Sequence, residues 1–485
     1  MYTPREEADI NAPRKLLGLL PETFDTDYID GAVLPFFLSG QYIAERPALP
    51  MIDLTLRKEN AIPPHLWGML YDGWAPDPKA GVSVFIQGYE ERGPDNERKK
   101  IYFSAVTPDL YAATYADKVG RFLAHFFDEA NTGQPLMHKY YEDYFDDLYW
   151  DLHLGVTGEA IPAEAREVRR AFIAVLGHWF PTSDVVRENF MRVRALRPIL
   201  TDWIDRRVQR MDAREVPDSH SEGTFVHYWL KNGGGGEHFR REDVVFEVFH
   251  NLLAFSQWGN MLYQTMGKLE ADQGDPDVKS WFTRTMTEGP DEADGAAFTP
   301  LDRFVMELFR TISPNGGSFS DVDTMRGLEP RAAGIVTPHL ATSQDPRHWR
   351  NPEAFDPDRY KAAPTSADND EARCQEVGLA RCPFPPAPFA VSDGRHAELT
   401  NSGFGAVYGL VDGRAYPVCD TAGYAPFGFG YRRCPGEQLT TEFFKQWLRT
   451  VWRDGIEFVR LDPKPLEQVP VAPRLVVPDN IGFRR

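Results

Sequence analysis

The sequence predicts a mainly α fold with small β-sheets, an α+β arrangement built as one large domain. Three observations predict it. Helical patterns occupy most of the chain between residues 109 and 313. One of these segments, Arg241–Met266, is apolar on most of its surface, which is typical of a helix buried inside a domain. Short β-like stretches such as Val82–Gln87 are separated by Pro and Gly.

Composition excludes several classes of partner. The 485 residues carry a net charge of −19, which repels nucleic acid and anionic membranes. No window approaches roughly 18 uncharged apolar residues, and the N-terminal segment contains early acids, so we expect a soluble protein with neither a signal peptide nor a membrane span. Four cysteines do not make a disulfide framework and fit a reducing cytoplasm. We expect a cytoplasmic monomer.

Four long helices are predicted before residue 270. The Gly-rich residues 231–236 that precede the last one are interpreted as a helix–helix linker, because a phosphate-binding loop would follow a strand and continue into Lys-Ser/Thr. At about 1.5 Å per residue the last helix is about 39 Å long, enough to cross a whole domain. The four are Asp109–Glu129, Ala163–His178, Arg187–Met211 and Arg241–Met266.

The next helix runs from Pro300 to about Ser313. Thr299 is a favoured N-cap, and proline is favoured at the first helical position. Glu307 and Arg310 are three residues apart, so their side chains are neighbours on the helix. Taken alone, this pair is typical of a surface salt bridge, which contributes less than about 1 kcal/mol.

A cysteine loop precedes the last helix, which is predicted over Gly436–Arg453. Residues 424–437 place Cys434 among glycines and arginines at the start of that helix. A helix N-terminus and neighbouring guanidinium groups both favour the thiolate, the form that ligates metal. Glycines let the backbone approach a flat cofactor, and Arg432 is placed to pair with a cofactor carboxylate.

The pattern Phe427-x-x-Gly430-x-Arg432-x-Cys434-x-Gly436 resembles the heme-ligand loop of the cytochrome P450 superfamily. The chain is similar to an atypical soluble, bacterial-type member. The resemblance implies a single large domain around a buried heme b, iron protoporphyrin IX. It implies Cys434 as the thiolate ligand, with Phe427, Gly430, Arg432 and Gly436 beside the cofactor.

Other segments agree with this resemblance in order and spacing. Glu307-x-x-Arg310 resembles the Glu-x-x-Arg of the family's K helix, and residues 345–360 resemble the segment that supplies a third member, Arg359. The resemblance implies a buried structural triad rather than acid–base chemistry. Asn96–Asp109 resembles the family's C-helix region, with Lys99, beside Arg98 and Lys100, as a candidate partner of a heme propionate.

The central helix departs from the family pattern. Members usually carry an acid followed by Thr over the heme, to deliver protons to bound dioxygen. The matching stretch here, residues 254–258, holds Ser256, Gln257 and Trp258, which we take as the candidate catalytic residues. Either the substrate or ordered water completes the relay, with Ser256 or Gln257 positioning the water, or the protein uses a peroxide and needs no relay.

Domain boundaries follow from the same resemblance. We expect an N-terminal extension over residues 1–30 and a heme domain over 31–485, with an insertion at about 361–423. Within the insertion, residues 407–416 predict a β-hairpin with an Asp-Gly turn. Its three cysteines are interpreted as free thiols, ahead of a disulfide between the first two and of a zinc site, because no Cys-x-x-Cys pair occurs. They are Cys374, Cys382 and Cys419.

Three functions are open. The first is a heme-thiolate monooxygenase that acts on an apolar or aromatic small molecule and takes electrons from a ferredoxin or flavoprotein reductase. The second is a peroxygenase, or a hydroperoxide isomerase or dehydratase, which works without a reductase. The third is a non-catalytic heme protein such as a gas sensor. The first is favoured because monooxygenation is the usual activity of the family.

Overall fold

A computed structural model places the backbone in two compact units. The first comprises Met1–Phe103, Gly295–Phe298 and Met306–Pro435, and the second comprises Ser104–Asp294, Thr299–Val305 and Gly436–Arg485. The predicted extension, the stretch Val82–Gln87 and the three insertion cysteines lie outside the described residues. Those described are 97–139, 144–177, 183–233, 239–292, 294–296, 298–312, 317–320, 335–338, 351–362, 408–411, 414–417, 426–427, 434–461, 468–472 and 475–485.

Most of the described helices belong to the second unit, and local sequence explains several of their ends. The side chains of Thr107 and Asp275 cap the helices that follow them, each of which begins with proline. Gly155 ends α9 with a φ of +62°, and a Cβ at this position would clash with the His220 carbonyl oxygen. The helices are α6 (Pro108–Leu110), a π-helical turn (Tyr111–Tyr115), α7 (Ala116–Phe126), α8 (Leu136–Lys139), α9 (Phe145–Leu154), α10 (Ala163–Gly177), α11 (Ser183–Asp212), α12 (Asp218–Ser221), α13 (Phe225–Gly233), α14 (Arg241–Leu269), α15 (Pro276–Glu288) and α19 (Glu437–Arg453).

Two of the described α-helices contribute to the first unit. α5 (Glu97–Phe103) belongs to it entirely, and α16 (Pro300–Ile312) starts in the second unit and ends in the first. Each long helix predicted from the sequence is present, with ends shifted by a few residues. The predicted helix 109–129 is divided by the π-helical turn and ends at Phe126. Among the described residues, no helix is long and apolar enough to cross a bilayer.

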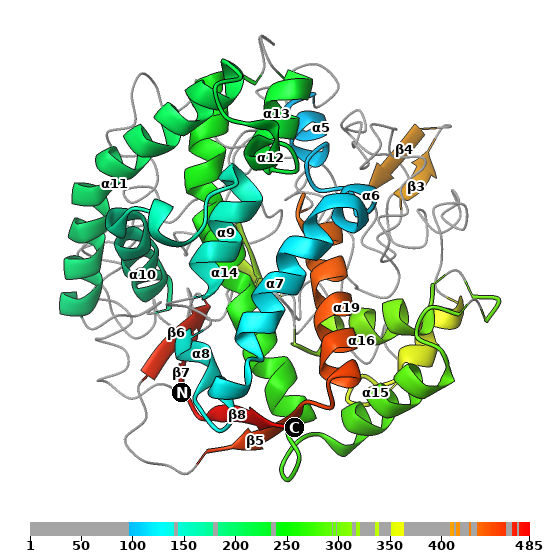
Figure 1. Ribbon diagram of the computed structural model, residues 1–485. Helices are drawn as coiled ribbons and strands as arrows, with labels where there is room; N and C mark the ends of the chain where they lie inside the picture. The colour runs from blue at the N-terminus through cyan, green and yellow to red at the C-terminus, as the bar shows by residue number, and fades with distance from the viewer. Residues whose placement is uncertain are drawn as a thin grey trace, which may run out of the picture. The chain divides into compact units, whose positions relative to one another are not determined.

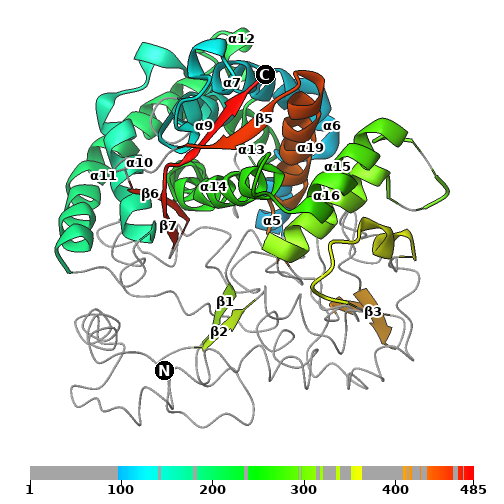
Figure 2. The same cartoon turned by 90° about the horizontal axis from the view of Figure 1, so that it is seen from below.

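α14 is the central helix of the second unit. Its 29 residues span about 44 Å, and α10, α11, α13 and α15 contact it. α7 and α9 run in front of it in Figure 1, and Figure 2 shows α10 beside it. Residues 243–252 are all buried, which confirms the prediction of a buried central helix.

The strands pair in small antiparallel sheets. In the second unit β5 (Glu457–Arg460) pairs with β8 (Ile481–Arg484), and β6 (Gln468–Ala472) pairs with β7 (Leu475–Pro478). In the first unit β1 (Gly317–Ser320) pairs with β2 (Ile335–Pro338). β3 (Tyr408–Val411) pairs with β4 (Arg414–Pro417), with Val411 opposite Arg414, so the predicted hairpin is confirmed.

Candidate functional site

Cys434 is half-buried and directly precedes the turn that starts α19. It is the one cysteine within the described part of the chain. Its backbone N–H donates to the Phe427 carbonyl oxygen over 2.9 Å, which closes the loop between these two residues. Gly436 is the N-cap of α19, so the cysteine stands just outside the N-terminus of a 17-residue helix. This position favours a thiolate.

Phe427 holds the other end of this loop in place. Its side chain is 9% exposed, and its ring packs edge-on against Phe309 of α16, with centroids 5.1 Å apart and an interplanar angle of 84°. The backbone hydrogen bond of Cys434 is therefore accepted by a residue that packs against a buried part of α16. Phe309 lies between Glu307 and Arg310 in sequence, so the same turn of α16 carries two members of the predicted triad.

The structure brings Glu307, Arg310 and Arg359 together. Arg310 donates to both carboxylate oxygens of Glu307, through Nε at 2.8 Å and through an Nη atom at 2.7 Å. Arg359 Nε donates to Glu307 Oε1 at 3.1 Å. The side chains of Glu307 and Arg310 are fully buried and that of Arg359 is 11% exposed, so the pair is not a surface salt bridge.

Both arginines also reach the backbone of the segment that follows α16. Arg310 donates to the carbonyl oxygens of Pro352 and Ala354 at 2.9 and 3.0 Å, and Arg359 donates to that of Ala354 at 3.0 Å. Burial acts to lower the pKa of Arg310, but the hydrogen bonds and charge of Glu307 outweigh it and raise that pKa above its usual value. The guanidinium therefore stays charged.

The sequence reasoning missed a further partner of the triad. The Tyr360 hydroxyl donates to Glu307 Oε2 at 2.9 Å, and the backbone N–H of Asp356 donates to Oε1 at 2.9 Å. Glu307 thus accepts five hydrogen bonds from four residues. Tyr360 directly follows Arg359, but a single sequence gives no signal that its hydroxyl turns inward.

On the central helix, Trp258 packs inside the second unit. Its side chain is 3% exposed, and its Nε1–H donates to Thr440 Oγ1 of α19 at 2.9 Å. Its ring stacks on Phe443 of α19 with centroids 4.1 Å apart. These contacts favour a packing role for Trp258 over the catalytic role predicted for it. Gln257 is half-buried, and the side chain of Ser256 lies outside what the structure describes.

Ala254 lies on α14 one turn before Trp258. Ala254 is exposed although His250, Asn251 and Phe255 around it are buried. The accessible position is therefore displaced one turn towards the N-terminus from Trp258.

The other predicted cofactor residues are only partly described. Gly430 and Arg432 lie outside the described residues, as does the side chain of Lys99, whose backbone is in α5. Arg98, next to Lys99, is described, and its side chain is 4% exposed. Arg98 lies on α5 beside Lys99, and a role for either residue as the partner of a heme propionate stays a prediction.

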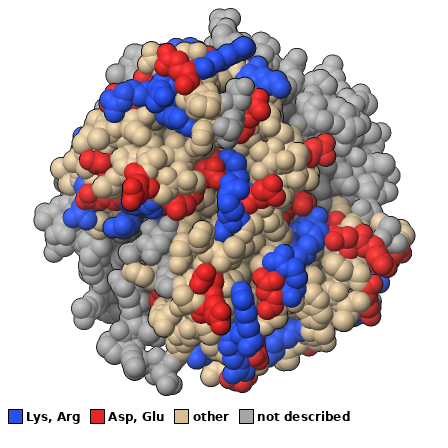
Figure 3. Space-filling view, in the orientation of Figure 1, with Lys and Arg blue, Asp and Glu red and all other residues tan. Residues whose placement is uncertain are grey.

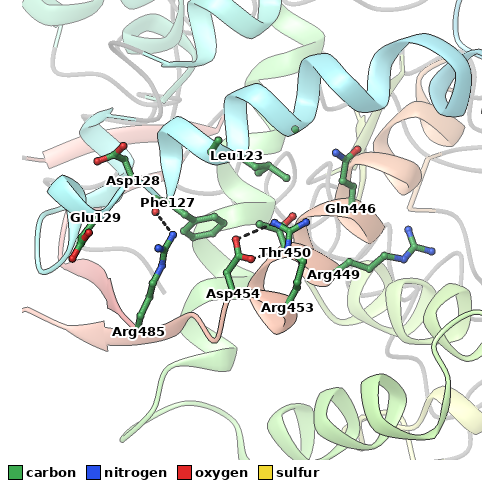
Figure 4. Close-up of a pocket in the computed structure, with 12 residues that line it drawn as sticks. Leu123, Phe127, Asp128, Glu129, Gln446, Arg449, Thr450, Arg453, Asp454 and Arg485 are labelled. Carbon is green, nitrogen blue, oxygen red and sulfur yellow. Dashed lines mark hydrogen bonds and ion pairs between the residues drawn. The ribbon is translucent and has the colours of Figure 1, made fainter.

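A pocket of about 510 Å³ between α7 and α19 lies elsewhere in the second unit. None of the predicted site residues lines it. Figure 4 shows Arg485 turned towards the Phe127 carbonyl oxygen, to which it donates at 2.7 Å, and Arg453 turned towards Asp454. Three arginines and three acids line it, so it has no preferred ligand charge. Figure 3 shows the same mixture of both signs over the described residues of this face.

Comparisons with known proteins find likeness in solved structures. No family model matches the chain, and no curated protein matches its sequence. The heme domain of a cytochrome P450DA mutant matches with a TM-score of 0.57 and 14% identity, over 96% of each chain. CalO2 matches with a TM-score of 0.56 and 14% identity, over 96% of this chain and 99% of its own. Retinoic acid-bound cyanobacterial CYP120A1 matches with a TM-score of 0.54 and 16% identity, over 94% of this chain and 88% of its own. At these identities the likeness shows a shared fold.

Proposed function

We propose that this chain, which has the cytochrome P450 fold, is a heme-thiolate oxidoreductase with Cys434 as the iron ligand. The observation that carries the proposal is the Cys434 loop. The loop ends at the N-terminus of α19 and is closed by the 2.9 Å hydrogen bond from the Cys434 backbone N–H to the Phe427 carbonyl oxygen. Phe427 packs on Phe309 of α16, next to the buried Glu307–Arg310 pair.

The residues present fit a heme. A half-buried cysteine before a helix N-terminus supplies a thiolate, and Arg98 supplies a buried cation in the same unit for a propionate. Ala254 supplies an accessible, small position on the central helix. When bound, heme would supply one-electron and oxygen chemistry that no protein side chain provides. The protein's own part is to hold the thiolate, bury the cofactor and orient the substrate.

The reaction we favour is monooxygenation of a mainly apolar or aromatic small molecule, with electrons from a ferredoxin or flavoprotein reductase. The 13% of aromatic residues in the chain supports an apolar substrate, because substrate pockets are lined mainly by hydrophobic and aromatic side chains. We also propose that the protein is cytoplasmic and monomeric.

Peroxide use is the second candidate, and the composition of α14 favours it. Between Ala254 and Trp258 this helix has neither an acid nor a threonine, and Gln257 cannot exchange a proton as a carboxylate does. We expect added peroxide to support a larger share of the activity than is usual in the family. Product formed per reducing equivalent, compared with and without peroxide, separates the two. Tight coupling to a reductase together with no peroxide-driven turnover would exclude the second candidate.

The ligand assignment is tested by the spectrum of the reduced, carbon monoxide-bound protein. Thiolate ligation should give a strongly red-shifted Soret band, and Cys434→Ser should abolish it. Matched Cys374→Ser, Cys382→Ser and Cys419→Ser variants should keep the band. Loss of the band in one of these three, with its retention in Cys434→Ser, would show that the ligand is another cysteine.

A further inference from the structure

The pocket between α7 and α19 involves none of the residues assigned to the heme. Its volume of about 510 Å³ is in the range of small-molecule sites. Leu123 and Ala124 of α7 and Thr450 of α19 form its least polar wall. Leu123 and Thr450 are buried, whereas Ala124 is exposed. An apolar group of a ligand can therefore lie against Ala124 without displacing any core side chain.

Two of the three arginines that line this pocket already have carboxylate partners. Arg453 donates to both carboxylate oxygens of Asp454, through Nε at 2.7 Å and through an Nη atom at 3.0 Å. Arg449 forms an ion pair with Asp291. A bidentate pair such as that of Arg453 uses the guanidinium edge that would otherwise hold an anion. These two arginines are therefore poor candidates for binding a ligand.

Arg485, the third arginine, has only a neutral partner within the described residues. One of its Nη atoms donates to the Phe127 carbonyl oxygen at 2.7 Å, and no described carboxylate forms an ion pair with it. A guanidinium has five N–H donors, so several remain available to a ligand. The hydrogen bonds from Arg453, followed by the charges of Arg453 and Arg485, outweigh burial and lower the pKa of Asp454. The charge of Arg485 therefore acts inside the pocket.

Asp128 and Glu129 supply the opposite charge. Both are exposed, and no lysine or arginine that the structure describes forms an ion pair with either one. Asp128 accepts from the Ala130 backbone N–H at 2.9 Å, as the N-cap of the short 3₁₀ turn that follows it. Figure 4 shows both acids on the same side of the pocket as Arg485. The pocket thus has a cation and two acids that lack charged partners.

Hydrogen bonds fix the segments that carry these charges. The Gly133 backbone N–H donates to the Phe483 carbonyl oxygen at 2.9 Å, which joins the turn to β8 two residues before Arg485. Asn131 Nδ2 donates to the His125 carbonyl oxygen at 2.8 Å, which holds the turn against the end of α7. Groups that are held in place before a ligand arrives lose less conformational entropy when they bind it.

We propose that this pocket binds a small zwitterion, namely a free amino acid with an apolar side chain. Its carboxylate binds Arg485, its ammonium group binds Glu129, and its side chain lies against Ala124. Glu129 is assigned rather than Asp128 because Asp128 already caps a turn. An anion would face three acids here and a cation would face three arginines, so a ligand with a single charge is disfavoured. The inference goes beyond the proposed function and does not depend on it.

The test is equilibrium dialysis of the heme-loaded protein at pH 7 with phenylalanine, 3-phenylpropionate and 2-phenylethylamine. The second probe lacks the ammonium group of phenylalanine and the third lacks its carboxylate, while all three keep the ring. Phenylalanine should bind at least about fivefold more tightly than either of the others, because it alone makes both ion pairs.

Three variants locate the binding. Arg485→Gln should weaken phenylalanine and 3-phenylpropionate severalfold without weakening 2-phenylethylamine, and Glu129→Gln should weaken phenylalanine and 2-phenylethylamine without weakening 3-phenylpropionate. Ala124→Trp fills the space against α7 and should abolish the binding of all three probes. Arg206→Gln and Glu242→Gln, at exposed positions of α11 and α14, are the matched controls and should bind like the unmodified protein.

The far-ultraviolet circular dichroism of each variant shows whether it is folded, and three separate positions keep the test valid if one variant fails. No binding of phenylalanine at millimolar concentration, or equal binding of the three probes, would overturn the inference. So would phenylalanine binding that Ala124→Trp leaves intact, since the amino acid would then lie elsewhere in the protein. Folded Arg485→Gln or Glu129→Gln proteins with an unchanged order of affinities would overturn it as well.

Discussion

At the scale of single residues, Glu307 joins the members of the buried triad. It accepts five hydrogen bonds, and two of its donors are arginines. Glu307→Ala should lower the free energy of unfolding by about 3–5 kcal/mol, because it leaves the guanidinium groups buried without their carboxylate. Urea titration and heme content of the soluble fraction would measure this.

Tyr360→Phe is the matched control for that variant. It removes one hydrogen bond and no charge, so it should cost only about 1 kcal/mol and leave heme content near normal. A Glu307→Ala protein as stable and as heme-loaded as Tyr360→Phe would contradict the structural role.

The spacing of Glu307 and Arg310 made their contact predictable from the sequence, because residues three apart on a helix are always neighbours. Their burial was not predictable from that spacing, which a surface pair shares. It depends on residues 351–360, whose carbonyl groups and Tyr360 hydroxyl arrive from another part of the chain. The resemblance of residues 345–360 to a known segment predicted the role of Arg359. The contacts of the carbonyl groups and of the Tyr360 hydroxyl are visible only in the structure.

At the scale of elements, the α14–α19 contact depends on Trp258. Trp258→Thr would introduce the hydroxyl group that is usual in the family. Because it also removes a buried indole, it should lower the free energy of unfolding by about 3–5 kcal/mol. Trp258→Phe keeps a ring stacked on Phe443 and loses the hydrogen bond to Thr440. We therefore expect it to lower the free energy of unfolding by only about 1 kcal/mol.

A double-mutant cycle with Thr440→Val checks the assignment. The coupling energy between Trp258→Phe and Thr440→Val should be about 0.5–1.5 kcal/mol, since the two side chains share one buried hydrogen bond. Additive effects, or a Trp258→Thr protein of normal stability, would show that Trp258 has no structural role and would restore it as a candidate catalytic residue.

The exposed position on α14 was beyond prediction from the sequence. A helix that is apolar nearly all round has no polar stripe to mark its exposed side. Ala254, Gln257 and Trp258 all lie within one turn, and each is a plausible pocket residue by type. Only the packing of Trp258 against α19 and the exposure of Ala254 distinguish them.

At the scale of the whole molecule, three buried groups tie folding to pH. Burial lowers the pKa values of His153 and His250 to about 3. Below the usual histidine pKa of about 6.5 the unfolded chain therefore binds protons that the folded chain does not, and stability falls as the pH falls towards 3. Asp146 acts in the opposite direction, because burial outweighs Arg169 and raises its pKa to about 6. The folded state then binds a proton below pH 6 that the unfolded state binds only below about 3.9.

The magnitudes decide the net direction. At pH 5 each histidine lowers the free energy of unfolding by about 2 kcal/mol relative to pH 7, and Asp146 offsets roughly 1 kcal/mol of this, so we expect a net loss of roughly 2–3 kcal/mol. Urea titrations at pH 7 and pH 5 measure it. His153→Gln should reduce the difference between the two pH values by about 2 kcal/mol, and Asp146→Asn should enlarge it by roughly 1 kcal/mol. His220→Gln, at an exposed histidine, should leave it unchanged. If His153→Gln and His220→Gln had the same effect on this difference, the buried histidine would not be a source of acid sensitivity.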